Sequence, residues 1–520
     1  RIEKYNRLAV FSSNSTRITK KLFLSRSNII RLTIYFSLLT NQWPDRSTIV
    51  HLFEWKYKDI ADECERFLAP KGFGGVQVIS SLGIGNSDRT WYERYQVMSY
   101  KLTTRSGNVD DFLNMTRRCN KVGIRIYADV VVNHMTGDNP NNVGTAGSTA
   151  NFANYSYPAV PYEREHFHYP YCSIETYNDA NQVRNCQLVG LKDLNQTMSY
   201  VQRKIVRFFN RLIHYGVAGL RVDAAKHMWP NDLNKIYKRL HNLNTNFGFS
   251  RNSRPYIYQE VIYYGNEAVQ PNEYTGLGDV GTELKNCFRG QNALKWLVSW
   301  GPQWGLSPSD TAFVFVDNHD TQRSDDVLTY KESRAYKGAI AFMLAHPYGE
   351  PRVMSSYFFN SSNQGPPEDA NEDIVSPSIN SDETCGNGWV CEHRWRQIYQ
   401  MVAFRNTAKD TLIQNWWDNG NNQIAFSRGG NGFIAFNLEG KDLNQTLQTG
   451  LPAGQYCDVI TGKRQDAECT GKRVTVDNDG EAAIYVAANE EDMHLAIHVG
   501  KEVSTLLINR YDRYISSVCC

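Results

Sequence analysis

The chain has 520 residues, a formal net charge of +2 and a charged-residue content of 21%. This length is sufficient for a large domain with insertions and a further domain, and the near-zero net charge gives no reason to expect nucleic acid as a partner. No apolar run reaches the roughly 20 residues of a membrane-spanning helix, so we expect a soluble protein without a membrane partner.

The N-terminal segment, residues 1–43, is basic and polar before it passes into the apolar run RLTIYFSLLT. That run is similar to part of a signal peptide, but it lacks a small-residue cleavage pattern. Because a polar lead of this kind has little apolar surface with which to pack, we expect residues 1–43 to lie outside the fold. We expect the same of the C-terminal tail, residues 502–520.

Three buried strands are expected next, and a long irregular stretch follows them. The strands are IVHLFEW, GGVQVIS and VGIRIYADVVV, which are rich in β-branched and aromatic residues. Residues 134–194 are rich in Asn, Gly and Tyr, and they show no sustained helical or strand period. A stretch of this length inside a compact domain is expected only where the loop is functional.

Helix and strand then alternate along the chain. The segment SYVQRKIVRFFNRLIHYG repeats Val201, Ile205, Phe208 and Leu212 at helical spacing. Strands are expected at VAGLRVDAA, YIYQEVI, AFVFVDNH and EPRVMSS, with a weak strand near residues 281–284. After about residue 411 the pattern changes to short alternating strands with Gly and Asn turns, which predicts an antiparallel β-sandwich.

Four of the expected strands end on a carboxylate: Asp129, Asp223, Glu260 and Asp320. Most Asp and Glu side chains cap helices or form surface ion pairs. A charge directly after an apolar strand costs free energy to bury, so its presence there indicates a functional role. Recurrent strand-end carboxylates favour a (β/α)₈ barrel, in which the active site lies at the C-terminal ends of the strands. The expected chemistry is therefore carboxylate-based.

The segments IRIYADVVVNH, GLRVDAAKHMWP, PYIYQEVI and FVFVDNHDTQR, in this order, resemble the signature regions of the α-amylase family of glycoside hydrolases, in particular its animal-type members. WYERYQ, NCQLVGLKDLNQ and CGNGWVCEHRWRQIY extend the resemblance over roughly residues 46–500. It implies a (β/α)₈ TIM barrel (domain A) with an inserted loop-rich domain B and a C-terminal antiparallel β-sandwich (domain C). The corresponding ranges are 44–133 and 195–410 for domain A, 134–194 for domain B and 411–501 for domain C.

The resemblance also implies a retaining mechanism, which needs one ionised and one protonated carboxyl across the scissile bond. In this reading Asp223 is the nucleophile, Glu260 is the general acid/base, and Asp320 stabilises the transition state. Arg221 lies two residues before Asp223 and therefore points to the same face of its strand. The substrate-binding residues implied by the family are Trp91, Tyr92, Tyr95, Gln96, His134, Arg221, Lys226, His227 and His319.

Two ions follow from the same resemblance. Calcium would join domain B to the barrel through side-chain oxygens of Asn133 and Asp193 and backbone carbonyls of Arg184 and His227, an all-oxygen set that suits a hard cation. Chloride would lie between Arg221, Asn318 and Arg352. A structural alternative for Arg352 is an ion pair with a carboxylate.

The chain contains 11 cysteines, which is many for a cytosolic enzyme and indicates an oxidising, extracellular compartment. By resemblance to animal amylases, the disulfides pair Cys64 with Cys119, Cys172 with Cys186, Cys385 with Cys391, and Cys457 with Cys469. Cys287, Cys519 and Cys520 then remain without a partner, and the simplest reading is a buried free thiol plus a tail.

Taken with the resemblance, the sequence predicts a secreted, monomeric, calcium-dependent and chloride-responsive α-amylase, most like arthropod digestive enzymes. Its expected substrates are starch, glycogen and malto-oligosaccharides, cleaved internally at α-1,4 bonds. Two alternatives stay open: another enzyme of the superfamily, such as an α-glucosidase or a transglycosylase, and an inactive carbohydrate-binding homologue.

Overall fold

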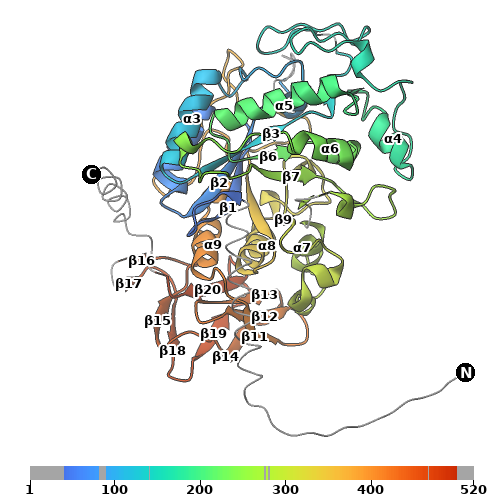
Figure 1. The fold of residues 1–520 in the computed structure, drawn as a ribbon. Coiled ribbons are helices and arrows are strands. Elements are labelled where there is room, and N and C mark those ends of the chain that lie inside the picture. The colour runs from blue at the N-terminus through green and yellow to red at the C-terminus, as the bar shows by residue number, and fades with distance from the viewer. Residues whose placement is uncertain are drawn as a thin grey trace, which may run out of the picture.

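The computed structural model describes residues 40–80, 89–139, 141–274, 277–278, 281–465 and 468–500. Its centre is a closed barrel of parallel strands in the order β1-β10-β9-β8-β7-β6-β3-β2 (Figure 1). This confirms the predicted (β/α)₈ barrel. The strands are β1 (Ser47–Leu52), β2 (Phe73–Ile79), β3 (Arg125–Val130), β6 (Gly219–Val222), β7 (Tyr256–Glu260), β8 (Leu277–Gly278), β9 (Ala312–Val314) and β10 (Glu350–Ser355).

Four of the barrel strands, β1, β2, β3 and β10, are covered on both faces, as is usual in a parallel sheet. Every residue of β1, β2, β3 and β10 is buried. The predicted helix after domain B is α5 (Ser199–His214), and it buries the expected apolar face. The other α-helices of the barrel domain are α2 (Tyr57–Glu63), α3 (Val109–Lys121), α6 (Pro230–Tyr237), α7 (Gly281–Phe288), α8 (Ser333–Ala345) and α9 (Arg396–Thr407).

The sixth barrel strand does not lie where the sequence pattern placed it. The prediction was a weak strand near residues 281–284, but these residues begin helix α7, and the strand is β8 at Leu277–Gly278. Its two residues pair with Gln259 and Glu260 of β7 on one side and with β9 on the other. A strand of two residues shows no alternation, so no period-2 pattern could locate it.

Residues 40–43 belong to the packed fold, so the domain boundary predicted at residue 44 lies too late. Thr40 and Gln42 are 1% and 7% exposed. The Tyr127 hydroxyl of β3 donates to the Thr40 carbonyl, and Gln42 Nε2 donates to Glu350 Oε1 of β10 at 2.8 Å. The segment therefore covers the N-terminal end of the barrel. The rest of the predicted atypical segment and the tail after residue 500 lie outside the described residues.

Domain B is the irregular insertion between β3 and α5, drawn in teal in Figure 1. Its two ends are joined by an antiparallel pair, β4 (His134–Met135) with β5 (Lys192–Asp193). Between them the described residues form only short elements, of which the longest is α4 (Ala180–Asn185). The insertion thus starts and finishes at one place beside the C-terminal ends of the barrel strands.

The C-terminal domain is all β, as predicted, and lies below the barrel in Figure 1. One antiparallel sheet has the order β11-β12-β13-β20, and the remaining strands pair as β14-β19, β15-β18 and β16-β17. Gln397 of α9 donates to Asp492 at 2.7 Å, which fixes this domain to the barrel helices. The strands are β11 (Ile413–Asp418), β12 (Gln423–Arg428), β13 (Gly432–Asn437), β14 (Leu443–Gln448), β15 (Gly454–Cys457), β16 (Arg464–Gln465), β17 (Glu468–Cys469), β18 (Arg473–Val476), β19 (Glu481–Val486) and β20 (His494–His498).

The four disulfides implied by the family resemblance are formed: Cys64–Cys119, Cys172–Cys186, Cys385–Cys391 and Cys457–Cys469. Cys287 is a buried free thiol, as expected, whereas Cys519 and Cys520 lie outside the described residues. Among the described helices, none is long and apolar enough to cross a membrane.

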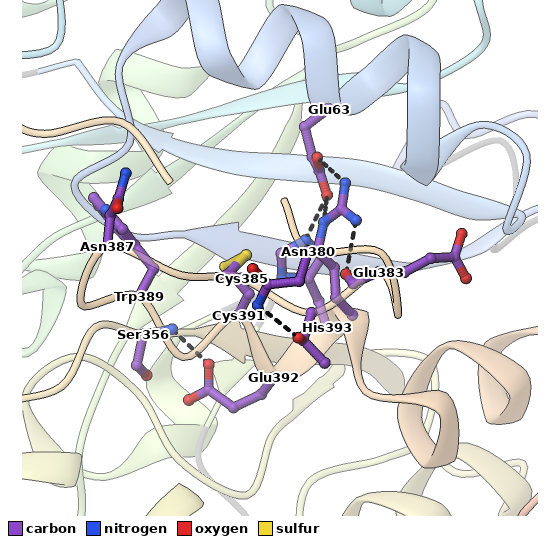
Figure 2. The surroundings of a disulfide bond; sticks show 12 residues. Glu63, Ser356, Asn380, Glu383, Cys385, Asn387, Trp389, Cys391, Glu392 and His393 are labelled. Atoms are coloured by element: carbon purple, nitrogen blue, oxygen red, sulfur yellow. Dashed lines mark hydrogen bonds and ion pairs between the residues drawn. A yellow bond between two sulfur atoms is a disulfide. The ribbon is translucent and has the colours of Figure 1, made fainter. Parts of the chain in front are cut away.

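The disulfide Cys385–Cys391 lies in the segment that follows β10 (Figure 2). Directly after it, His393 Nε2 lies 2.8 Å from the buried carboxylate of Glu63 on α2, and Arg394 forms two bonds to the same group at 2.7 and 2.6 Å. The segment is therefore locked to the first barrel helix, which holds the adjacent C-terminal end of β10 in place.

Candidate active site

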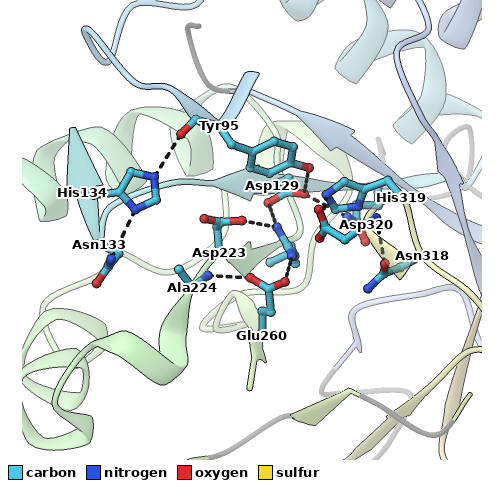
Figure 3. Close-up of polar contacts among 12 residues, drawn as sticks. Tyr95, Asp129, Asn133, His134, Asp223, Ala224, Glu260, Asn318, His319 and Asp320 are labelled. Carbon is cyan, nitrogen blue, oxygen red and sulfur yellow. Dashed lines mark hydrogen bonds and ion pairs between the residues drawn. The ribbon is translucent and has the colours of Figure 1, made fainter. Parts of the chain in front are cut away.

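The four strand-end carboxylates meet at the C-terminal end of the barrel (Figure 3). Asp129 lies in β3, Asp223 directly follows β6, Glu260 ends β7, and Asp320 follows β9. Asp129 and Asp223 are 1% and 7% exposed, whereas the Asp320 side chain is 36% exposed and that of Glu260 17%. Adjacent parallel strands thus bring together carboxylates that lie up to 191 residues apart in the sequence.

One guanidinium contacts three of these carboxylates. Arg221 Nη1 lies 2.8 Å from Asp129 Oδ1 and 2.7 Å from Asp223 Oδ1, and Nη2 lies 2.8 Å from Glu260 Oε1. The other Glu260 oxygen accepts a hydrogen bond from the Ala224 backbone N–H at 2.7 Å. Arg221 and Asp223 point to the same face, as the strand spacing predicts. Both Asp223 and Glu260 are therefore fixed around one cation.

Burial makes these carboxylates harder to ionise. It raises the pKa of Asp223 well above the usual range, and the charge of Glu260 adds to the effect while Arg221 opposes it. Burial and then Glu260 raise the pKa of Asp320 to about 7. Such crowding of acids in a partly open site is typical of catalytic centres.

Neutral histidines stand beside the carboxylates. His319 Nε2 lies 3.2 Å from Asp320 Oδ2, and its ring stacks on Tyr95 with centroids 4.9 Å apart. His134 Nε2 lies 3.0 Å from the Tyr95 carbonyl. Burial lowers the pKa of His134 to about 4 and that of His319 well below its usual range. Near neutral pH both rings are uncharged hydrogen-bonding groups.

The predicted aromatic residues form one wall of the site. Trp91, Tyr92 and Tyr95 lie in the short 3₁₀ helix Trp91–Tyr95, with the Trp91 ring 5.7 Å from Tyr92 and 5.6 Å from His319. The Tyr95 hydroxyl donates to Asp129 at 3.1 Å. Gln96, next in sequence, accepts a hydrogen bond from Thr136 at 2.8 Å and thereby connects this wall to domain B.

Lys226 and His227 lie in the short 3₁₀ helix Ala225–His227, just after Asp223 and in contact with domain B. Lys226 Nζ donates to the Ile262 carbonyl at 2.7 Å and pairs with Glu267 at 2.8 Å; it also lies 4.6 Å from the Tyr177 ring centroid. The His227 ring instead faces the Val183 carbonyl at 2.9 Å. Sequence reasoning missed Glu267 and Tyr177, because both come from irregular loops.

The residues predicted to hold calcium fit a hard cation. Asn133 Oδ1 and Asp193 Oδ1 are buried and have no hydrogen-bond partner, although the β4–β5 pairing brings their backbones together. The Arg184 guanidinium pairs with Glu273 at 2.8 Å and, as a cation, cannot bind another cation, so Arg184 could contribute only its carbonyl oxygen. Among the described residues there is no group of three or more His, Cys, Asp or Glu side chains suited to a metal. A site here would therefore combine the Asp193 carboxylate with amide and carbonyl oxygens.

One of the residues predicted to hold chloride, Arg352, is also incompletely paired. Arg352 Nη1 donates to Gln77 Oε1 at 2.9 Å, while its Nε and Nη2 are buried without a partner. Among the residues that the structure describes, no carboxylate forms an ion pair with Arg352. Gln77 Nε2 also donates to Asp129 at 3.1 Å. Asn318 precedes Asp320 by two residues. Its side-chain oxygen accepts a hydrogen bond from the Asp320 backbone N–H at 2.9 Å.

Gln77 was not predicted as a site residue, although it links Arg352 to the carboxylate cluster. Its signal in the sequence is a single polar side chain within the apolar strand FGGVQVI. A fully buried amide in such a strand needs hydrogen-bond partners, and here they are Asp129, Arg352 and the Tyr258 hydroxyl.

Comparisons with known proteins agree with this architecture. The family model described as "Alpha amylase, catalytic domain" matches residues 88–278, and "Alpha amylase, C-terminal all-beta domain" matches residues 414–500. The chain is 56% identical to an α-amylase of Tribolium castaneum, over 88% of this chain and 95% of that protein. It is 56% identical to an α-amylase of Tenebrio molitor, over 88% and 98%, and 55% identical to an α-amylase-related protein of Drosophila kikkawai, over 89% and 95%.

Solved structures give the same result. The chain resembles wild-type α-amylase I of Eisenia fetida with a TM-score of 0.83 and 42% sequence identity, covering 88% of this chain and 98% of that one. A mutant of the same protein in complex with maltohexaose matches with a TM-score of 0.84 and 42% identity over the same shares of both chains.

Proposed function

This chain belongs to the α-amylase family of glycoside hydrolases, and from that premise we propose that it is a secreted, calcium-dependent enzyme that cleaves internal α-1,4 bonds of starch and glycogen with retention of configuration. The observation that carries the proposal is the arrangement of Asp223 and Glu260 around the single guanidinium of Arg221. A retaining glycosidase needs two carboxyl groups close together across the scissile bond.

In this proposal Asp223 attacks the anomeric carbon while Glu260 donates a proton to the departing glycosidic oxygen. Water then attacks the glycosyl–Asp223 ester, and Glu260 takes up the proton of that water. Arg221 favours the ionised form of Asp223 through its contact at 2.7 Å. Asp320 stabilises the positive charge that develops on the sugar ring.

The surrounding groups would bind the glucan on both sides of this centre. Trp91, Tyr92 and Tyr95 offer aromatic faces to the C–H patches of glucose rings. The neutral ring of His319, whose nitrogens have no hydrogen-bond partner among the described residues, can donate and accept a hydrogen bond with a sugar hydroxyl. The ring of His134 would line the site while it holds the Tyr95 carbonyl through Nε2. Together with Gln96, Arg221, Lys226 and His227, these residues make up the proposed substrate-binding set.

Calcium would be held by Asn133, Asp193 and the carbonyls of Arg184 and His227. Support comes from the two side-chain oxygens that are buried without a partner, since such oxygens are costly to bury unless a donor or a cation satisfies them. When bound, the ion would supply a structural cross-link between domain B and the barrel.

Chloride would be held by Arg221, Asn318 and Arg352. Two unpaired, buried donors on Arg352 support an anion there, because a buried cation without a counter-ion is unfavourable. Secretion is supported by the four disulfides, which persist in oxidising compartments.

The substrate range tests this proposal. The full chain should lower the viscosity of a starch solution before much reducing sugar appears, which is the mark of internal cleavage, and should act poorly on maltose. Faster hydrolysis of maltose than of starch would favour the α-glucosidase alternative. Activity on neither substrate, with calcium and chloride present, would favour the inactive homologue.

A further inference from the structure

An exposed aromatic side chain lies two residues before a possible modification site, in the segment that follows β10. The aromatic residue is Phe358, which is 57% exposed. The triplet Asn360-Ser361-Ser362 begins two residues later, and an Asn-x-Ser/Thr triplet is the acceptor motif for N-linked glycans in secreted proteins. These residues take no part in the proposed catalytic or substrate-binding set.

Phe358 and Asn360 lie on the same side of the chain. Burial alternates along this segment, because Tyr357 and Phe359 are buried, whereas the residues that follow each of them are exposed. Such alternation is that of an extended chain, in which residues two apart share a face. The Phe358 backbone N–H donates to the Gly388 carbonyl at 2.9 Å, which holds this stretch in place. A group attached to Asn360 would therefore lie on the side of the Phe358 ring.

Contacts on either side fix both the ring and the motif. The rings of Phe358 and Tyr330 meet edge to face, with centroids 5.6 Å apart and an interplanar angle of 87°. The backbone carbonyl of Ser362, the third residue of the motif, accepts a hydrogen bond from Trp91 Nε1 at 2.8 Å. The ring is thus oriented before any sugar arrives, which lowers the entropy cost of packing a sugar against it.

The other Asn-x-Ser/Thr motifs in the described part of the chain have different neighbours. They begin at Asn114, Asn154, Asn195 and Asn444. Two residues before the first two of these stand buried aromatics, Phe112 and Phe152, which are 0% and 8% exposed. Before the last two stand the aspartates Asp193 and Asp442. Among the motifs that the structure describes, only Asn360 has an exposed aromatic side chain at this position.

We propose that Asn360 carries an N-linked glycan whose first N-acetylglucosamine packs on the ring of Phe358. The C–H patches of a sugar are apolar and suit an aromatic face. In the transfer, Asn360 Nδ2 bonds to C1 of the first sugar of a lipid-linked oligosaccharide. The bond from C1 to the lipid pyrophosphate breaks, and the pyrophosphate leaves with its electron pair while the amide nitrogen loses one proton. The inference rests on the secretion included in the proposed function, because secreted chains meet this donor.

The first test measures occupancy of Asn360. The full chain is secreted from insect cells behind a supplied signal peptide, and its glycans are released enzymatically in water enriched in heavy oxygen. This release converts each occupied asparagine into an aspartate that mass spectrometry detects by its label. The peptide with residue 360 should be labelled in the wild type and in Ser362→Thr, which keeps the motif. It should be unlabelled in Ser362→Ala, which removes the motif hydroxyl but leaves Asn360 and Phe358 in place.

The second test asks whether the glycan packs on Phe358. Starting from protein with Asn360 fully occupied, Ser362→Ala should raise the unfolding equilibrium constant about fivefold, which corresponds to about 1 kcal/mol. In a Phe358→Ala background the same change should have less than about a twofold effect, because groups in contact are coupled in a double-mutant cycle. Leu412→Ala is the matched control: this side chain is also 57% exposed, and its loss should leave the fivefold effect intact.

Two results would overturn the inference. One is a secreted wild type whose residue 360 carries no label, and the other is an equal effect of Ser362→Ala with and without the Phe358 ring. Starch hydrolysis by the same wild-type preparation separates this inference from the proposed function. A labelled Asn360 in a protein that does not hydrolyse starch would count against the proposed function alone, and an active protein without the label would count against this inference alone.

Discussion

The catalytic end of the barrel and domain B differ in the contacts that hold their residues in place. In the barrel, each contact of Arg221 with Asp129, Asp223 and Glu260 is supplied by the protein itself, at the ends of continuous buried strands. Domain B is irregular, and at its junction with the barrel one side-chain oxygen, Oδ1, of each of Asn133 and Asp193 is buried without a hydrogen-bond partner among the described residues. The proposed chemistry thus rests on a scaffold that supplies its own contacts, whereas under the proposed function the adjoining wall would need an added ion.

The largest effect should come from the barrel carboxylates. We expect Asp223→Asn and Glu260→Gln each to lower kcat on starch by at least about 10³-fold, because they remove the nucleophile and the proton donor with little change in volume. The melting temperature should hardly change. Asp326→Asn is a suitable control, since its side chain is 91% exposed. Retention of more than a few per cent of activity by either variant would show that the assigned role is wrong.

Removal of calcium should affect domain B before the barrel. An ion at 100 times its Kd stabilises the folded state by about 2.7 kcal/mol, so excess chelator should lower the melting temperature. Hydrogen exchange should rise first in residues 134–194, while β1, β2 and β3 stay protected. The chelated Asp193→Asn variant provides the control, because it should show little further loss. An unchanged melting curve, or faster exchange in the barrel strands first, would contradict this comparison.

At the N-terminal end of the barrel, the free energy of unfolding should depend on the side chain of Gln42. The effect of this side chain should not depend on calcium. Gln42→Ala removes the donor to the buried Glu350 carboxylate, which should cost about 1–3 kcal/mol of unfolding free energy. Chelator should lower the stability of this variant and of the wild type by the same amount. The control is Asp45→Ala, an exposed neighbour. Equal stability of Gln42→Ala and wild type in denaturant titrations would mean that residues 40–43 do not contribute to the fold.

The smallest effect should come from chloride, within the barrel site. An anion held by Arg221 would lie near the general acid, because Arg221 contacts Glu260, and its removal should move the alkaline limb of the kcat profile to lower pH. Arg352→Gln should abolish the response and keep basal activity. Ionic strength must be matched with a salt of a larger anion, because screening alone alters the profile. If the alkaline limb of the wild type does not respond to chloride, the anion has no such role.

The sequence predicted the barrel because apolar strands ending in carboxylates leave a strong local signal. Asp223, directly after β6, and Asp320, after β9, are examples, and the structure brings them to one end of the barrel with Glu260. Strand β8 was misplaced because two residues cannot show alternation. The packing of Thr40 and Gln42 was missed because these contacts join residues more than 80 positions apart, for which the sequence has no local pattern.

The parts of the site that could not be predicted are those made by tertiary contact alone. Glu267 and Tyr177 meet at Lys226 from two separate loops, and neither loop has a periodicity that would reveal the meeting. Gln77 did leave a signal, since one amide within an apolar strand requires buried partners. The direction of the His227 ring, toward Val183 of domain B, follows from the fold of an irregular insertion.

The most direct test of the central claim is to trap the covalent intermediate. A fluorinated maltosyl fluoride, incubated with Glu260→Gln and digested for mass spectrometry, should leave one glycosyl group on the peptide that contains Asp223. The leaving fluoride needs no proton, so the missing acid should not prevent this step. An adduct on a different carboxylate, or no adduct together with first release of the β-anomer by the wild type, would contradict the account.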